Sequence, residues 1–522
     1  MPMRRFVSLA SLLFCPLASL LSTAEQLPPP PDPLARIKAA PGEGCSVSEA
    51  SQCAEATGKI IAGALGPSPL EENLRRLTDE VGGRMTGSPA MARAVAWAMA
   101  AFRQAGLNDA HTEEYTIPLV WSEGQTWLEV RAPMPFPVRL VSVGWSPPTP
   151  AGGIEAEVVD VGNGSEAEYA RAAGSSTGAI LLVHSEVGRT WEDLFNDYLR
   201  APAIIDRAVR AGARALLWTS THERGLLYRH QNSLTGELDR LPQAIVARED
   251  ALRLARFIAA GQKVRVQLAL PNRVGGPTKQ ENVVAEIRGR EKPDEFVLLG
   301  AHLDSWELGT GALDNGSNAA LVIEAARVIL ATGLRPRRSI RFVLFSGEEQ
   351  GALGSWAYVR AHRSELDRAI AVVIFDEGIG RVTGYSLGGR RDIEGGVREA
   401  LKPIESWSAN AHTADAFFGT DNLDFLLEGV PTLVANQEEA NYLPNYHASS
   451  DTLDKVDIRE LKLHTALAAA TVFALAERPE RLGKRQSRAE IEALMKETGL
   501  DKQLKTLGLW PQWAQGQRGR EP

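Results

Sequence analysis

The stretch FVLLGAHLDSWELGTGALDNG, residues 296–316, contains the pattern that decides the fold. Residues 296–301 form an apolar run, as expected of a buried strand, and they lead directly into His302. A glycine-rich turn over residues 309–316 then precedes a long helical pattern over residues 316–331. A buried strand, a polar turn and a helix in this order are the unit from which parallel α/β sheets are built.

Further apolar runs occur at residues 282–287, 340–345, 370–375 and 430–435. They do not alternate with polar residues, which indicates strands covered on both faces. We therefore predict an α/β fold with a mostly parallel sheet flanked by helices. Ligands of such sheets bind beyond the carboxyl ends of the strands, so the residues that follow these runs are candidates for a functional site.

Acidic side chains stand at several of these positions. The run 340–345 is followed by Ser-Gly and then by Glu348 and Glu349, and the run 370–375 is followed by Asp376. Adjacent carboxylates at a strand end point in different directions, so one can bind a metal while the other faces an attacking water. Asp314 lies at the entrance of the helix 316–331, where its two oxygens could bridge two divalent cations or could simply cap the helix.

Two histidines complete the candidate metal site. His302 and Asp304 point to the same side of the chain, so Asp304 can orient the imidazole without binding the metal itself. His447, in the segment NYHASSDT, supplies a second imidazole, with Asp451 as a helix cap or a further orienting partner. An isolated His-x-Asp is more often a surface strand end. Several metal-binding residue types at successive strand ends or loops favour a metal site.

Other polar residues have weaker assignments. Asp421 could contact substrate or stabilise its turn, and Tyr446 could line the pocket beside His447. His412 lies in a loop that could approach the substrate, although a structural role is favoured. His362 and His464 lie in helical patterns and are assigned structural roles.

Composition limits the classes of function. A formal net charge of -8 argues against a nucleic-acid-binding protein, which would need a basic face.

Residues 1–24 have two arginines, an apolar stretch and a small-residue end, which predicts a signal peptide and an exported protein, periplasmic or secreted. A lipoprotein modified at Cys15 is the alternative. No later apolar run is long enough to predict a membrane span. Cys45 and Cys53 are expected to form a local disulfide, or else remain free thiols.

The chain divides by pattern into five parts. Short strand and helix patterns over residues 120–270 predict a separate α/β or β-rich module inserted into the larger sheet domain. The segment 481–522 predicts a helix and an extension whose role stays open. The parts are the signal peptide 1–24, a Pro-rich lead-in or propeptide 25–65, the sheet domain 66–119 and 271–480, the insert 120–270, and the C-terminal extension 481–522.

Six blocks of this sequence resemble the M28 family of zinc metallopeptidases, in particular its carboxypeptidase Q-like branch. They are GGRMTGSPA (82–90), HLDSWELGTGALDNG (302–316), FSGEEQGALGS (345–355), FDEG (375–378), GTDNLDFLLEGVPT (419–432) and NYHASSDT (445–452). The resemblance implies that the insert 120–270 is a protease-associated (PA) domain. It also implies two zinc ions, one held by His302 and Asp376 and the other by Glu349 and His447. Asp314 would bridge them and Glu348 would act as general base.

The resemblance further implies a zinc exopeptidase that hydrolyses small peptides or dipeptides with free termini. An aminopeptidase acting on longer peptides, a glutaminyl-cyclase-like acyltransferase and a non-catalytic binding protein on the same fold remain alternatives. The expected partner is a peptide substrate, without nucleic acid, and the choice between monomer and homodimer stays open.

Overall fold

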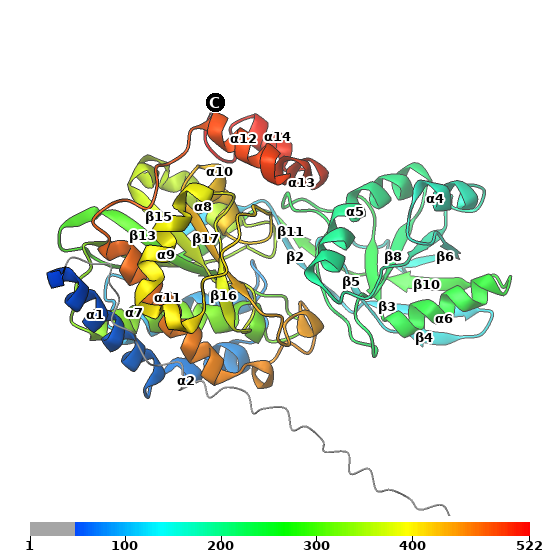
Figure 1. Cartoon of the computed structure of the whole chain (residues 1–522). Helices are drawn as coiled ribbons and strands as arrows, with labels where there is room; N and C mark the ends of the chain where they lie inside the picture. Colours follow the sequence, from blue (N-terminus) through cyan, green and yellow to red (C-terminus); the bar gives the residue numbers. More distant parts are fainter. Residues whose placement is uncertain (1–46, 522) are drawn as a thin grey trace, which may run out of the picture. The chain divides into compact units, whose positions relative to one another are not determined.

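The computed structural model describes residues 47–521 (Figure 1). The predicted signal peptide, the Cys15 alternative, Cys45 of the expected Cys45–Cys53 disulfide and most of the lead-in therefore lie outside the described residues. Residues 47–65 of that lead-in form helix α1 (Val47–Leu65). Ile60 and Ala64 of this helix are fully buried in the largest apolar core, so α1 packs as part of the sheet domain.

The larger sheet has seven strands in the order β1-β12-β14-β13-β15-β17-β16. The neighbours β14, β13, β15 and β17 are parallel, whereas β1, β12 and β16 pair antiparallel with their neighbours. The bounds are β1 (His111–Ile117), β12 (Thr278–Ile287), β13 (Lys292–His302), β14 (Arg338–Phe345), β15 (Ala369–Ile374), β16 (Val382–Ser386) and β17 (Thr432–Gln437).

The prediction of a mostly parallel sheet is therefore corrected to a mixed sheet with a parallel centre. The turn 288–291 between β12 and β13 is too short for the crossover of a dozen or more residues that consecutive parallel strands require. The edge strands β1 and β16 have the sequences HTEEYTI and VTGYS. The first is rich in polar residues and the second contains a glycine, so both lack the apolar continuity of a strand buried on both faces.

Helices cover both faces of the parallel centre, which explains the continuous apolar runs. Along β13, Val297 and Leu299 join the core beneath α7 (Ser317–Ala331) and α11 (Ile458–Glu477). The alternate residues Phe296 and Leu298 join a second core with residues of α8 (Leu353–Ala361) and α10 (Asn422–Leu427). The remaining helices of this part are α2 (Leu70–Arg75), α3 (Pro89–Gln104), α9 (Glu394–Leu401) and the short helical turns η2 (Arg76–Val81), η3 (Ala312–Gly316), η4 (Arg363–Arg368), η5 (Arg391–Ile393), η6 (Lys402–Trp407), η7 (Leu443–Asn445) and η8 (Leu453–Lys455).

Residues 127–269 build a second sheet of eight strands in the order β4-β3-β10-β6-β7-β8-β9-β5. Strands β6 to β9 are parallel and the others antiparallel, with α5 and α6 among its helices. A two-stranded ribbon of β2 (Val120–Ser122) and β11 (Arg273–Gly275) joins the two ends of the predicted insert. The bounds are β3 (Trp127–Ala132), β4 (Phe136–Val138), β5 (Leu140–Ser142), β6 (Ile154–Asp160), β7 (Ile180–Val183), β8 (Ala215–Thr219), β9 (Gln243–Val246), β10 (Arg265–Ala269), α4 (Glu166–Ala172), α5 (Trp191–Arg210) and α6 (Arg248–Ala259).

The C-terminal extension folds into three helices, α12 (Arg488–Thr498), α13 (Leu500–Thr506) and α14 (Trp510–Ala514). Their apolar side chains form a core with α10, in which Leu427 meets Leu494 and Trp513. Within residues 47–521, no helix combines the length and apolar character that crossing a membrane requires.

Candidate metal centre

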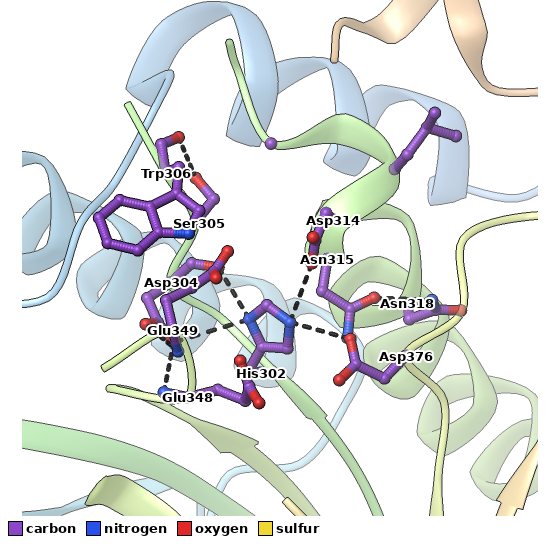
Figure 2. Close-up of polar contacts among 12 residues, drawn as sticks. His302, Asp304, Ser305, Trp306, Asp314, Asn315, Asn318, Glu348, Glu349 and Asp376 are labelled. Atoms are coloured by element: carbon purple, nitrogen blue, oxygen red, sulfur yellow. Dashed lines mark hydrogen bonds and ion pairs between the residues drawn. The ribbon is translucent and has the colours of Figure 1, made fainter. Parts of the chain in front are cut away.

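The carboxyl ends of the central strands bring the predicted ligands together, and Figure 2 shows four of them, His302, Asp314, Glu349 and Asp376. His302 is the last residue of β13, Glu349 follows β14, and Asp376 follows β15. Asp314 lies in the turn before α7, and His447 lies in the loop between β17 and α11. The side chains gather here because adjacent parallel strands end at the same edge of the sheet.

These residues form two groups of three that share Asp314. His302 Nε2 lies 2.9 Å from Asp376 Oδ1 and 3.1 Å from Asp314 Oδ1. His447 Nε2 lies 3.1 Å from Glu349 Oε2 and 3.3 Å from Asp314 Oδ2. In each group, the candidate ligand atoms lie within 4.8 Å of one another. Asp314 thus directs one oxygen to each group, as a carboxylate that bridges two cations would.

The donor set suits divalent metal ions. Three carboxylates and two imidazoles are gathered where little water reaches them, and neutral imidazole with carboxylate is a usual zinc-binding combination. Glu349 Oε1 is buried without a hydrogen-bond partner. Burial of this kind is costly for charges of one sign unless cations offset them. The described residues therefore fit a pair of bound cations.

The pKa values of the candidate ligands are shifted by burial and by their interactions with one another. Burial opposes ionisation of Asp314, but hydrogen bonds from His302 and His447 outweigh it and lower the pKa of Asp314. Burial raises the pKa of Glu349 to about 7. Burial would lower the pKa of His447, but the neighbouring Glu349 and Asp314 raise it to about 9. A bound cation would require these imidazoles to be neutral, because a histidine binds metal through an unprotonated nitrogen.

His447 has an unusual backbone. Its φ of 55° lies in the left-handed region, which a side chain other than glycine seldom adopts. The backbone N–H of Arg229, from the inserted segment, donates to the carbonyl of His447 at 2.9 Å. Arg229 is itself buried and paired with Glu123 and Glu307. The insert therefore holds the His447 loop in a conformation that its own backbone preferences would not select.

Asp304 accepts a hydrogen bond from the His302 ring through its backbone carbonyl and not through its carboxylate. His302 Nδ1 donates to the backbone carbonyl of Asp304 at 3.0 Å, while the Asp304 carboxylate is 3.7 Å away. That carboxylate instead accepts hydrogen bonds from the backbone N–H groups of Glu348 and Glu349, each at 3.3 Å. Asp304 thus fixes the His302 ring through its main chain and the Glu348–Glu349 turn through its side chain.

Asp451 holds the turn that carries Asp314. Its carboxylate accepts backbone hydrogen bonds from Ala312 at 3.0 Å, Leu313 at 2.7 Å and Asp314 at 3.1 Å. Burial raises the pKa of Asp451 to about 7. Of the two roles left open for Asp451, an orienting partner of the metal site is the one with contacts in the structure.

Arg84 is a residue whose role the sequence did not indicate. It is fully buried, and its guanidinium donates to the carbonyls of Leu303, Thr310 (2.8 Å) and Gly311 (2.9 Å). In the sequence, the segment GGRMTGSPA that contains it stands out only through its resemblance to the M28 family. Arg84 ties the loop after β13 to the turn before Asp314, and it places a cation behind the acidic cluster.

Glu348 faces the cavity beside the candidate metal ligands. Burial raises its pKa well above the usual range for a carboxyl. Asp421, which could contact substrate or stabilise its turn, is fully buried and is not among the residues that line the cavity. His412 also lies away from the cavity, accepting a hydrogen bond from the backbone of Tyr385.

A cavity of about 450 Å³ lies over the ligands. Tyr446 lines it, stacked on His447 with ring centroids 3.6 Å apart and its hydroxyl 3.5 Å from that of Tyr198 in α5. The sequence indicates that Tyr446 could line the pocket, but it does not indicate how many lining residues come from outside the sheet domain. Those of the insert are Trp191, Glu192, Leu194, Phe195, Tyr198, Leu199, His230, Gln231 and Leu234, and those of the C-terminal extension are Gln503 and Leu507.

Known proteins resemble the chain in sequence and structure. The model of peptidase family M28 matches residues 282–472. Carboxypeptidase Q of Bos taurus is 30% identical over 417 residues, covering 79% of this chain and 86% of that protein. Carboxypeptidase Q of Rattus norvegicus is 29% identical over 416 residues, with the same coverage.

Among solved structures, a peptidase M28 precursor from Shewanella amazonensis SB2B superposes with a TM-score of 0.76 at 28% identity, covering 84% of this chain and 99% of that chain. The zinc aminopeptidase BSAP from Bacillus subtilis has a TM-score of 0.63 at 19% identity, covering 80% of this chain and 97% of that one. At that identity, the second likeness concerns the fold alone.

Proposed function

The chain belongs to peptidase family M28, and from this premise we propose that it is a two-zinc exopeptidase acting on small peptides with free termini. The family makes it a metallo-exopeptidase; the number of zinc ions, the base and the substrate are our proposal. The observation that carries the proposal is the pair of three-residue groups that share Asp314, each built from one imidazole and two carboxylates.

The proposed ligands follow these groups. His302 and Asp376 would hold one zinc ion, Glu349 and His447 the other, and Asp314 both. When bound, the two ions would polarise a peptide carbonyl and bring the pKa of a water between them toward about 7. Asp304 and Asp451 keep the ligands in place through the backbone contacts described above.

Glu348 is the proposed general base. Its carboxylate projects into the cavity from the turn that also carries Glu349. It would accept a proton from the attacking water and return it to the departing amine, so that no covalent enzyme intermediate is needed. The backbone N–H of Glu348 donates to the carboxylate of Asp304, and this hydrogen bond fixes the backbone position from which the Glu348 side chain extends.

Substitution of the two adjacent glutamates tests this division of roles. Glu348→Gln should keep two zinc ions per chain and lose most turnover, by a factor of at least about 100. Glu349→Gln, the matched control one residue along, should lose bound zinc. Metal content is measured by elemental analysis and turnover with free dipeptides. A Glu348→Gln enzyme with near-normal activity would show the base to be wrong. Activity unaffected by a chelator would remove the metal proposal altogether.

The charged residues that line the cavity favour recognition of a free amino group. Glu192, Glu377 and Asp415 line it, whereas none of its lining residues within 47–521 is a lysine or arginine. A C-terminal carboxylate would therefore find no lysine or arginine there, while an ammonium group would find carboxylates. This observation supports the second candidate, an aminopeptidase acting on longer peptides. Free, N-acetylated and C-amidated peptides distinguish the two ends, because only N-acetylation should abolish cleavage.

We also propose that the insert 120–270 is a PA domain, within a sheet domain of residues 66–119 and 271–480. The separate second sheet of residues 127–269 supports the insert as a unit. Export through cleavage after Ala24 remains a proposal that N-terminal sequencing of the mature protein would test. Size-exclusion chromatography with light scattering would decide between monomer and homodimer.

A further inference from the structure

Helix α13 of the C-terminal extension lines the substrate cavity, far in sequence from the metal ligands. We infer that Leu507, directly after this helix, forms an apolar subsite with Leu234 of the insert and Phe418, and that this subsite limits the size of a substrate side chain. The inference rests on the proposed peptidase function and adds a specificity-determining residue to it. The ligand class is an apolar amino-acid side chain of a small peptide.

The cavity face of α13 is set by helical spacing. Gln503 and Leu507 are four residues apart, so they lie on the same side, and both line the cavity. Leu504 points instead into the core of the extension, where it is buried. Thr506, next to Leu507, is exposed and does not line the cavity. The helix therefore presents one apolar and one polar side chain to the substrate space.

The three members of the subsite come from three parts of the chain. Leu234, Phe418 and Leu507 are partly buried, and each packs against the core that α10 shares with the extension. All three also line the cavity. Their partial exposure leaves apolar surface directed toward the cavity, and burying such surface against an apolar substrate group is favourable by about 25 cal/mol per Å².

Two polar contacts keep α13 against the cavity. Gln503 Oε1 accepts the backbone N–H of Phe418 at 3.2 Å, which joins the helix to the lining loop. Further along, the buried Arg518 donates to both carboxylate oxygens of Asp424, at 2.7 and 2.8 Å. Arg518 also donates to the carbonyl of Gly351, two residues after Glu349, at 3.1 Å.

Moving the extension away would leave the charge of Asp424 buried without its partner, which is strongly unfavourable. Helix α13 also contacts α5 of the insert, which carries the lining residues Phe195 and Tyr198. The extension is thus held between the sheet domain and the insert. Leu507 consequently belongs to a fixed wall, and its size should decide which side chains fit.

The test compares Leu507→Trp and Leu507→Ala with the matched control Thr506→Trp. Each change is placed in the Glu348→Gln background, so that peptide binding is measured without turnover. The probes are the zinc-loaded protein and two peptide series, Xaa-Ala and Ala-Xaa, with Xaa as alanine, leucine or phenylalanine. Calorimetry gives each dissociation constant. A misfit of this size in an apolar pocket usually changes discrimination about 10- to 200-fold.

In one of the two series, Leu507→Trp should weaken binding of the phenylalanine peptide relative to the alanine peptide at least about tenfold, and Leu507→Ala should shift this ratio the other way. Thr506→Trp should leave the ratio unchanged. Ratios that stay constant in both series for both Leu507 variants, in folded protein, would overturn the subsite. Failure of the enzyme with Glu348 intact to cleave any peptide would overturn the proposed function instead.

Discussion

The carboxylate of Asp451 offers a sharp test of how the metal centre is held. It accepts three backbone hydrogen bonds from the turn that positions Asp314, the carboxylate shared by both ligand groups. Asp451→Asn has nearly the same shape but only one acceptor oxygen. That oxygen can keep the bonds from Ala312 and Leu313, while the new amide would point its own hydrogens at the N–H of Asp314.

The expected cost follows from this count of bonds. One hydrogen bond to a charged group contributes about 1.5–3 kcal/mol, and about 1.4 kcal/mol corresponds to a factor of ten. If this cost falls on the position of Asp314, zinc affinity should fall about 10- to 100-fold, the range usual for residues that orient metal ligands. The fold should survive, because two of the three bonds remain.

Zinc affinity is measured by competition with a chromophoric chelator, and folding by circular dichroism. Asp454→Asn is the matched control, because Asp454 is three residues along the same loop, largely exposed, and bonded only to its own neighbours Thr452 and Lys455. It should leave zinc affinity unchanged. If Asp451→Asn binds zinc within twofold of the unmodified protein, the carboxylate does not position Asp314 and the reasoning fails.

Two further predictions concern stability. Arg518→Met should destabilise the fold by about 3–5 kcal/mol, because it leaves the carboxylate of Asp424 buried and unpaired. Adding Asp424→Leu should recover most of that loss, as measured by denaturant unfolding. An equal loss of stability in the single and the double variant would contradict a charge effect. Burial would lower the pKa of His362, but Glu113 at 2.9 Å and the nearby Glu365 outweigh it and raise the pKa. This pairing therefore stabilises the fold fully below about pH 6.5, the usual His pKa, and the contribution disappears as pH rises through the raised value. The melting temperature of His362→Gln should accordingly approach that of the unmodified protein between pH 6 and pH 9, whereas a constant difference would refute the pairing.

The centre of the larger sheet could be predicted because its signals are local. The runs 296–301 and 340–345 lie within β13 and β14, and the helical pattern 316–331 corresponds to α7. Burial on both faces removes alternation, so these strands stand out in the sequence. Strands β1 and β16 lie at the sheet edges, where polar side chains are tolerated, and no comparable pattern marks them.

Three of the predicted ligands meet in space for the same local reason. His302, Glu349 and Asp376 stand at the ends of central parallel strands, so the order of those strands is enough to bring them together. Asp314 and His447 lie in a turn and a loop whose positions depend on contacts with Asp451 and Arg229. The supporting contacts are different. Arg84 is more than 200 residues from the carbonyls of Leu303 and Thr310 that it binds, and no spacing in the sequence connects them. The two roles of Asp304 likewise depend on whether its carbonyl or its carboxylate faces His302, which only the folded backbone decides.

The walls of the cavity show why chemistry was easier to predict than specificity. Metal ligands must be particular residue types, so several His, Asp and Glu residues at successive strand ends are informative together. A wall residue needs only to be apolar and correctly placed, and Leu507 is indistinguishable in sequence from a leucine of the core. Its placement depends on contacts of the extension with α10, with the turn after Glu349 and with α5 of the insert. Relatives with the same ligands but other inserts or C-terminal segments should therefore share the reaction and differ in the peptides they accept.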